Sequence, residues 1–421
     1  MLPIVNPKCA GLDVHKKFVT VYRIVGDGQR KREVQARTYS TMSDDLEALR
    51  TWLAEGGVTH VAMESTGVFW QPIHNRLEDD FNVYLVNAQT VKRMAGRKTD
   101  MKDAEWLAIL MEHGLLQASF VPERAQRELR ELSRYRQTLV EEHSRFVNRL
   151  QKVMEGTNLK LSSVATRMRG VSAQAMLQAI LEGQTDPKVL AELARGRLRN
   201  KRDQLESALK GQITPHQRFM LSDLLIQLDF LDERIALVEA EIERALAQLP
   251  NFEEAVRLLD TIPGVNRMAA VTIVAEMGVD MTRFPSDRHL AAWAGVAPGN
   301  NETGGKQRPT KARQGNKYLR RILTLAARAA SHTKDTYLRS LYYRLAARRG
   351  VARASLAVGH TILQMAYHMI QRHQSYIELG ANYLDSLDKA QLAKRLVKRL
   401  EGLGYVVEAK QPIPSLSLST A

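Results

Sequence analysis

The chain has 421 residues, of which 44% are hydrophobic and 25% are charged. This composition is that of a folded protein with several domains and excludes a disordered or fibrous chain, while the single cysteine, Cys9, excludes a disulfide framework or a cysteine zinc cluster. The 61 Lys and Arg residues exceed the 46 Asp and Glu residues and give a net charge of +15, which favours a nucleic acid over a membrane surface as partner.

Residues 1–117 have the pattern of an α/β domain. Apolar and β-branched residues predict a meander of three strands and then two strands separated by a helix, as in a parallel pair. A helix capped by Ser43 is predicted to end at Gly56 and Gly57, and the chain becomes helical again from Lys98. The strands are predicted at residues 8–14, 18–25, 34–39, 60–64 and 82–86.

Residues 118–250 have a coiled-coil pattern. Apolar residues recur in alternating steps of three and four residues over 221–249, and an earlier helix that opens with Pro122 near its first position has the same register. The two helices can pair as an antiparallel hairpin with residues 159–210 at its tip, or between copies of the chain, and we favour pairing between copies. Two polar residues occupy seam positions of the earlier helix, Arg136 and His143.

A third domain is predicted at residues 251–350, followed by terminal helices and a tail at 351–421. The turn at 262–265 joins two short helices and resembles a helix-hairpin-helix, in which backbone N–H groups bind a phosphate. An ordinary corner between two helices is the alternative. A Gly- and Asn-rich loop follows at 295–305, and the Pro- and Ser-rich residues 412–421 are predicted to be disordered.

The positive charge is concentrated in one segment. Residues 1–120 have no net charge, whereas residues 301–350 have a net charge of +11, which is more than a solvated helix face accounts for. We therefore predict that this segment binds the phosphates of a nucleic acid. The predicted contact residues are Lys306, Arg308, Lys311, Arg313, Lys317, Arg320 and Arg321.

Four acidic residues of the first domain stand where acids are costly unless they are used. Asp13 lies inside an apolar strand and Glu64 ends another, while Asp100 and Asp103 lie three residues apart at a helix start. Converging carboxylates repel one another unless divalent cations neutralise them, and oxygen ligands alone favour Mg²⁺ or Mn²⁺. Two such ions about 4 Å apart promote phosphoryl transfer. Each acid also has a structural alternative, as a turn residue, an ion-pair partner or a helix-start acid.

These acids lie in three motifs, Gly11-Leu-Asp-Val-His-Lys16, Met63-Glu-Ser-Thr-Gly67 and Lys98-Thr-Asp-Met-Lys-Asp-Ala104. The motifs resemble the acidic blocks of insertion-sequence transposases of the DEDD class, the IS-one-ten family. Three later stretches are similar to the second conserved domain of that family. They are Ile262-Pro-Gly-Val265, Ala294-Gly-Val-Ala-Pro298 and Gly315-Asn-Lys-Tyr-Leu-Arg320.

The resemblance implies an RNase H-like (RuvC-like) fold whose four acids hold Mg²⁺ at the scissile phosphate. It also implies that a hydroxyl of the C-terminal domain attacks DNA covalently, that a noncoding bridge RNA pairs with target and donor DNA, and that the protein assembles as a multimer. That hydroxyl is typically a serine before a glycine. The matching tripeptide here is Glu302-Thr-Gly304, so Thr303 is the expected nucleophile.

We therefore expect a DNA transposase or recombinase that acts by two-metal phosphoryl transfer, in the cytoplasm and associated with the nucleoid. One alternative keeps the first domain as a structure-specific or junction-resolving nuclease that uses water in place of Thr303. The other is a non-catalytic coiled-coil protein that binds nucleic acid and whose acids are structural. No apolar run reaches the roughly 18 residues of a membrane span.

Overall fold

The computed structural model describes residues 2–28, 32–65, 67–87, 103–298, 302–303, 306–307 and 315–408, with the backbone alone at 302–303 and 306–307. Four predicted site residues lie outside these ranges, as do residues 412–421 of the predicted disordered tail. They are Asp100, Arg308, Lys311 and Arg313. The chain divides into two compact units, Met1–Pro122 and Glu123–Ala421.

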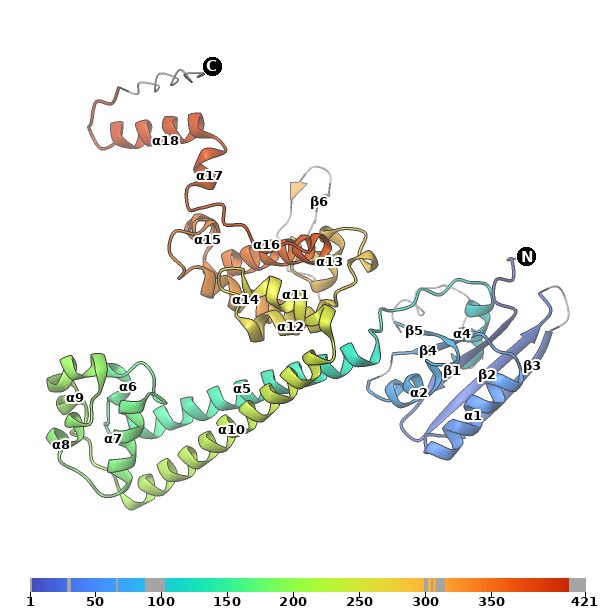
Figure 1. The fold of residues 1–421 in the computed structure, drawn as a ribbon, viewed down its shortest axis with the longest axis horizontal. Coiled ribbons are helices and arrows are strands. Elements are labelled where there is room, and N and C mark those ends of the chain that lie inside the picture. The colour runs from blue at the N-terminus through green and yellow to red at the C-terminus, as the bar shows by residue number, and fades with distance from the viewer. Residues whose placement is uncertain are drawn as a thin grey trace. The chain divides into compact units, whose positions relative to one another are not determined.

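A mixed sheet of five strands forms the centre of the first unit, in the order β3-β2-β1-β4-β5 (Figure 1). The strands β1 (Lys8–Val14), β2 (Phe18–Gly26) and β3 (Arg32–Ser40) form an antiparallel meander. The strands β4 (His60–Glu64) and β5 (Asn82–Val86) extend the sheet in parallel with β1. The predicted strands and the α/β class are thereby confirmed.

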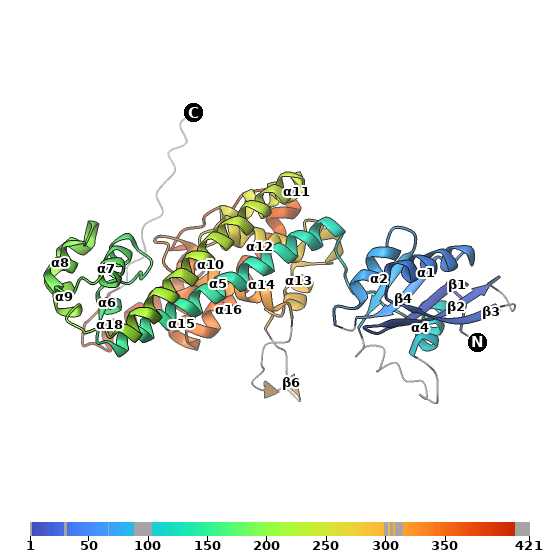
Figure 2. The same ribbon diagram turned by 90° about the horizontal axis from the view of Figure 1, so that it is seen from below.

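Helices cover both faces of this sheet (Figure 2). On one face α1 (Ser43–Glu55) and α2 (Trp70–Leu77) share an apolar core with Leu12 of β1. On the other face α4 (Asp103–Glu112) packs over Cys9 of the same strand. Because side chains alternate along a strand, β1 contributes to both cores, and its residues are buried almost without interruption.

Two predicted helix starts are wrong by one or two residues. Met42, in extended backbone, occupies the N-cap position of α1, so Ser43 is already helical. The carboxylate of Asp45 accepts a hydrogen bond from the Ser40 backbone N–H at 3.1 Å, which ties the helix start to β3 without a serine cap. Pro122 lies two residues before the first long helix, α5 (Arg124–Gly156). Glu123 is the N-cap residue of that helix.

The helix α5 packs antiparallel to a second long helix, α10 (Pro215–Ala247), in one chain (Figure 1). Arg136 Nε donates a hydrogen bond to Glu239 Oε1 at 2.7 Å, and His143 Nε2 lies 3.2 Å from Asp232 Oδ1. The two polar seam residues of α5 thus pair with acids of α10 and match its register. The sequence analysis favoured pairing of these two helices between copies of the chain, but they pair within one chain. Association of copies stays a prediction.

Residues 157–214 form a helical lobe at the end of this hairpin, which we call the tip lobe (Figure 1). Met176 and Leu205 of the lobe share a core with Leu150 of α5 and Leu221 of α10, so the lobe is anchored on both long helices. Its elements are α6 (Leu161–Val164), α7 (Val171–Leu181), α8 (Pro187–Glu192), the 3₁₀ helix η1 (Gly196–Lys201) and α9 (Arg202–Ala208).

The rest of the second unit is mainly helical, and a large apolar core joins its helices α11 to α16 to the hairpin. Ile262 and Val265 of the predicted phosphate-binding turn are buried, and the Asn266 side chain accepts a hydrogen bond from the Ala269 N–H at 2.9 Å. These features occur in a helix-hairpin-helix and in an ordinary corner between helices, so phosphate binding by this turn stays a prediction. None of the helices in the described part of the chain is long and apolar enough for a membrane span.

The elements of the second unit that follow the hairpin are α11 (Pro250–Asp260), α12 (Arg267–Met277), η2 (Met281–Arg283), α13 (Asp287–Ala294), β6 (Glu302–Thr303), β7 (Lys306–Gln307), α14 (Lys317–Ala330), α15 (Tyr337–Arg349), α16 (Val351–Arg372), α17 (Tyr383–Ser386) and α18 (Lys389–Glu401).

Candidate active site

Two of the predicted acids follow paired residues of adjacent parallel strands. Leu12 of β1 is in register with Met63 of β4, so the next residues, Asp13 and Glu64, stand side by side at the carboxyl ends of these strands. Cys9 and Ala62 both belong to the core beneath α4, and side chains of the same parity face the same side. Asp13 and Glu64 therefore face the side of the sheet that α4 covers.

The start of α4 brings a third acid to this side. Gly11 lies under the helix, where an added Cβ would come within 2.2 Å of the Ala104 carbonyl oxygen and 2.4 Å of the Ala108 nitrogen. Only glycine permits this approach of two backbones. The first described turn of α4, which begins with Asp103, is thereby held over β1 two residues before Asp13.

Three further side chains in this part of the sheet come from β1, β2 and the turn between them. His15 Nε2 lies 3.0 Å from Asp13 Oδ2, and the Asp13 side chain is 29% exposed, so it is open to a substrate. The Tyr22 hydroxyl donates a hydrogen bond to Glu105 Oε1 at 2.9 Å, and burial together with this carboxylate raises the pKa of Tyr22. Burial raises the pKa of the Cys9 thiol to about 12, so this thiol is not a nucleophile.

The donor set fits a hard divalent cation, because Asp13, Glu64 and Asp103 offer carboxylate oxygens on one partly exposed face. Among the described residues no group of three His, Cys, Asp or Glu side chains is close enough to hold a metal ion. The remaining predicted ligand, Asp100, lies outside the described ranges.

Thr303 lies in a separate element of the second unit. It pairs with Lys306 in the short antiparallel ladder of β6 and β7, in which Glu302 pairs with Gln307. The segment between α13 and α14 that includes this ladder is called the Thr303 loop. Its two ends touch, because a Cβ added to Gly315 would lie 2.4 Å from the Gly295 nitrogen.

A buried polar cluster holds the C-terminal end of this loop. The Asn316 side chain accepts hydrogen bonds from the N–H groups of Tyr318 and Leu319 at 3.1 Å and so caps α14. Its amide nitrogen donates to Glu276 Oε2 at 2.5 Å. Glu276 belongs to α12 and is fully buried. The loop end is therefore bonded to a helix that lies earlier in the chain.

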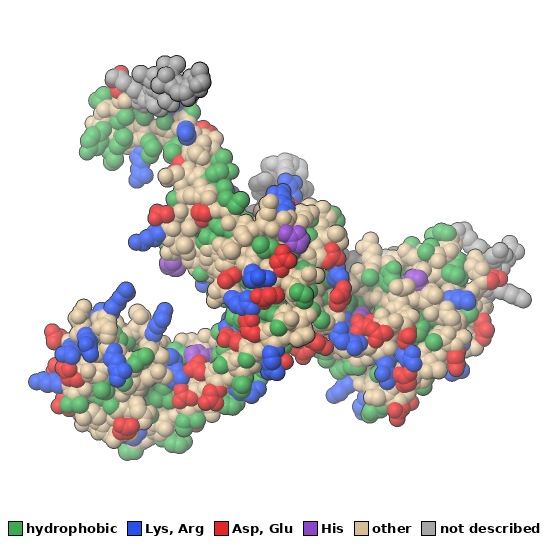
Figure 3. Space-filling model, viewed as in Figure 1, with side chains coloured by type: hydrophobic (Ala, Val, Ile, Leu, Met, Phe, Trp, Pro, Cys, Tyr) green, Lys and Arg blue, Asp and Glu red, His purple; other side chains and the backbone are tan. Residues whose placement is uncertain are grey.

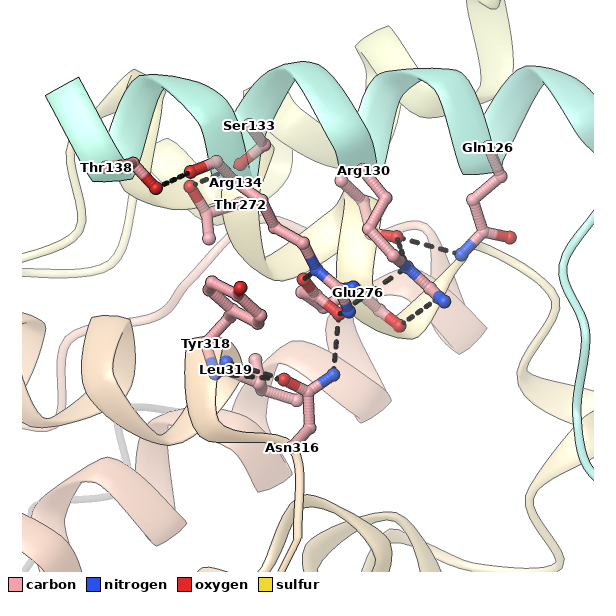
Figure 4. Close-up of polar contacts among 11 residues, drawn as sticks. Gln126, Arg130, Ser133, Arg134, Thr138, Thr272, Glu276, Asn316, Tyr318 and Leu319 are labelled. Atoms are coloured by element: carbon pink, nitrogen blue, oxygen red, sulfur yellow. Dashed lines mark hydrogen bonds and ion pairs between the residues drawn. The ribbon is translucent and has the colours of Figure 1, made fainter. Parts of the chain in front are cut away.

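Two arginines of α5 complete the cluster (Figure 4). Arg134 binds Glu276 with two hydrogen bonds, from Nε to Oε1 at 2.6 Å and from Nη2 to Oε2 at 2.8 Å. Arg130 Nε lies 3.4 Å from Oε2, and Arg130 Nη2 donates to the Glu276 carbonyl at 2.8 Å. Burial lowers the pKa of Arg130 to about 10. One carboxylate thus joins α5, α12 and the start of α14.

Sequence reasoning missed Glu276. The signal that could have found it is a lone acid in the apolar helix Arg267–Met277, where burial requires partners. The arginines that supply them lie more than 140 residues earlier, with Arg134 at a sequence separation of 142.

Three predicted nucleic-acid contacts are described with side chains. Lys317 is exposed, with Nζ 4.9 Å from the centre of the Tyr318 ring, whereas Arg320 is half-buried and Arg321 forms an ion pair with Glu141 of α5. Lys306 is described by its backbone alone. Of these three side chains, that of Lys317 is best placed to meet a phosphate.

Known proteins resemble this chain at both ends. A family model described as a transposase matches residues 10–159, and one described as transposase of the IS116/IS110/IS902 family matches residues 256–344. A probable family 20 transposase of Pseudomonas aeruginosa is 27% identical over 271 residues, which cover 64% of this chain and 70% of that protein. A 43.6 kDa protein of insertion element IS110 from Streptomyces coelicolor is 28% identical over 275 residues, which cover 60% and 65%.

Proposed function

Because the chain belongs to the IS110 family of transposases, we propose that it cuts and rejoins DNA strands by phosphoryl transfer that depends on Mg²⁺ or Mn²⁺. One observation carries the proposal: Asp13 and Glu64 end adjacent parallel strands on the face where Asp103 opens α4. The proposal includes an RNase H-like first unit, coiled-coil packing of α5 with α10, and guidance by a bridge RNA that pairs with target and donor DNA.

The four acids hold the divalent ions in this proposal. When bound, two such ions supply positive charge to the attacking and leaving oxygens of the phosphate. Asp13 and Glu64 would contribute oxygens from the sheet and Asp103 from the start of α4, and Asp100, three residues earlier in the sequence, would be the fourth ligand. His15 restrains the Asp13 carboxylate through its contact of 3.0 Å.

Thr303 is the proposed nucleophile. Its hydroxyl loses a proton as the oxygen forms a bond to the scissile phosphorus, while the bond from phosphorus to the oxygen of one strand end breaks and that oxygen takes up a proton to become a hydroxyl. A strand hydroxyl later attacks the same phosphorus, and Thr303 leaves and regains its proton. The number of phosphate ester bonds is unchanged, so rejoining needs no external energy source. The threonine methyl group limits χ1 to few orientations for in-line attack.

The contacts at the ends of the Thr303 loop support this role. Gly295 lies against Gly315, and Asn316 is bonded to Glu276, so the loop leaves and re-enters the helical body at one place. Cations in and after the loop would hold the DNA strand. These are Lys306, Arg308, Lys311, Arg313, Lys317, Arg320 and Arg321.

Substitution of the acids tests the catalytic assignment. We expect Asp13→Ala and Glu64→Ala to abolish strand cleavage in Mg²⁺ while DNA affinity is retained, because these variants lose metal ligands and no phosphate-binding cation. The exposed acid of β3 provides the control Glu33→Ala, which should cleave normally. Full cleavage by Asp13→Ala would contradict the proposed site, because the catalytic groups would then lie elsewhere.

Trapping of a covalent adduct tests the nucleophile. Denaturing electrophoresis should detect a protein–DNA adduct with the natural chain and with Thr303→Ser, but none with the isosteric variant Thr303→Val, which lacks the hydroxyl. Thr310→Val is the control from the same segment and should retain the adduct. Cleavage that persists in Thr303→Val would instead indicate a nuclease that uses water.

A further inference from the structure

The tip lobe has a concentration of positive charge that the proposed reaction does not use. Residues 157–214 contain ten Lys and Arg against five Asp and Glu, whereas α5 and α10 together contain eleven and twelve. Half of these cations occur within residues 195–202, which include no acid. Lys and Arg side chains are prominent on the lobe face seen in Figure 3. Almost all of the lobe lies between the two matched family segments, the first of which ends at residue 159 and the second of which begins at residue 256.

Part of this charge surrounds one pocket of about 650 Å³. The pocket lies between the α6–α7 connection, the start of α7 and the segment that enters η1. Its lining, all of it within the described chain, contains no Asp, no Glu and no aromatic side chain. Four exposed cations line it: Arg167, Arg195, Arg197 and Lys201.

These four cations differ from two neighbouring arginines, which form ion pairs with acidic side chains. Arg169 is paired with Asp229 and Asp232, and Arg202 is paired with Glu192. Among the described residues the four pocket cations form no such ion pair. Like charges that face one pocket raise its electrostatic potential, and an anion bound there would lower the free energy of all four.

The helix α7 adds a second source of positive potential. Its first residues, Val171, Ser172 and Ala173, line the pocket, and its N-cap, Gly170, has no side chain to cap it. The nearby Ser172 hydroxyl accepts a hydrogen bond from the Arg195 backbone N–H at 2.9 Å, which fixes the approach of η1 to α7. The positive end of an 11-residue helix dipole is thus directed at the same space as the four cations.

We propose that this pocket binds the phosphodiester backbone of a nucleic acid. The absence of aromatic side chains from its lining leaves no platform for base stacking, so the contact is with the backbone and is independent of base sequence. The pocket volume exceeds that of a single phosphate group, and a strand of DNA or of RNA supplies the same chemistry. The tip lobe is therefore an anchoring site distinct from the acids and from Thr303.

Two variants with equal charge loss test the proposal in the full chain. The pocket variant carries Arg195→Ala, Arg197→Ala and Lys201→Ala. The control variant carries Lys188→Ala, Arg202→Ala and Lys210→Ala, which remove three exposed cations of the same lobe that do not line the pocket. Fluorescence anisotropy with a labelled DNA duplex and a labelled RNA hairpin, without divalent metal, gives affinity as a function of salt concentration.

We expect the pocket variant to bind DNA, RNA or both about tenfold more weakly at about 0.1 M salt or below, and its salt slope to fall by about 2 to 3, while the control changes by less than about threefold. The probe that loses affinity identifies the strand. Unchanged affinity for both probes, or equal losses in both variants, would overturn the proposal. Thermal unfolding checks that both variants fold. Asp13→Ala should bind normally, so failure here is distinct from failure of the catalytic assignment.

Discussion

Glu276 is a carboxylate that is fully buried in the helical part of the second unit. A carboxylate without solvent exposure is stable only with charged or hydrogen-bonding partners, and Arg134, Arg130 and Asn316 provide them. The cost of removing water from these groups offsets much of the attraction between the charges. We infer that the cluster contributes mainly to the position of Asn316, and so to the end of the Thr303 loop.

Substitution of Glu276 should therefore affect stability and the loop together. Glu276→Ala leaves two arginines without their partner and should lower the free energy of unfolding by about 3–5 kcal/mol. Glu276→Gln retains the shape and part of the bonding and should cost less, while formation of the Thr303 adduct falls in both. Urea unfolding measures the first effect. Glu233 is an exposed acid of α10, and the control Glu233→Ala should change stability by about 0.5 kcal/mol or less.

At the scale of elements, the site depends on how α4 crosses β1. The register of β1 with β4 places two acids at the same level, and the close approach of α4 to the backbone at Gly11 holds the helix start, with Asp103, over the same face of the sheet. The sequence motif around Asp13 therefore includes a residue whose role is to permit helix packing.

Gly11→Ala should separate α4 from the sheet. The added Cβ would meet the backbone of Ala104, which cannot move without the helix, so we expect a loss of about 1–3 kcal/mol in stability and weaker strand cleavage. Thermal unfolding and a cleavage assay measure the two effects. Gly156→Ala is the control, because a Cβ there meets no atom within 4 Å. Normal cleavage by Gly11→Ala would show that the position of α4 does not matter for the reaction.

The pairing of α5 with α10 is also decided at this scale. Heptad spacing is compatible with pairing inside one chain or between chains, because the same apolar stripe is buried in both. The contacts of Arg136 with Glu239 and of His143 with Asp232 match the two helices in antiparallel register within the chain. These exposed or half-buried pairs stabilise the hairpin only weakly, so we infer that their main effect is on register.

For the whole molecule, charge separates tasks along the chain. Residues 1–120 have no net charge, whereas residues 301–350 carry +11 and the tip lobe carries a further excess. Cationic side chains near a metal site would repel the divalent ions that its carboxylates hold. Phosphate binding, in contrast, requires cationic side chains. In the proposed function the two tasks lie in different segments of the chain, which avoids this conflict.

Removal of RNA tests guidance at the scale of the whole protein. If a bridge RNA directs the protein, ribonuclease treatment of the purified protein should abolish cleavage at the specific target while unspecific DNA binding remains, and added RNA from the element should restore cleavage. Sequencing of products identifies the cleaved sites. An RNA-free protein that retains full target specificity would contradict guidance.

The sequence by itself determined the strands, the long helices, the acidic motifs and the basic segment, because each depends on residues close together in the chain. Periodicity, turns and charge are local properties and need no knowledge of the fold. Only the tertiary structure decided that α5 and α10 meet within one chain, that Gly11 lies under α4, and that a pocket in the tip lobe gathers four cations. It also decided the partners of Glu276, since a buried charge can be satisfied by arginines 142 or more residues away and no local pattern records which ones.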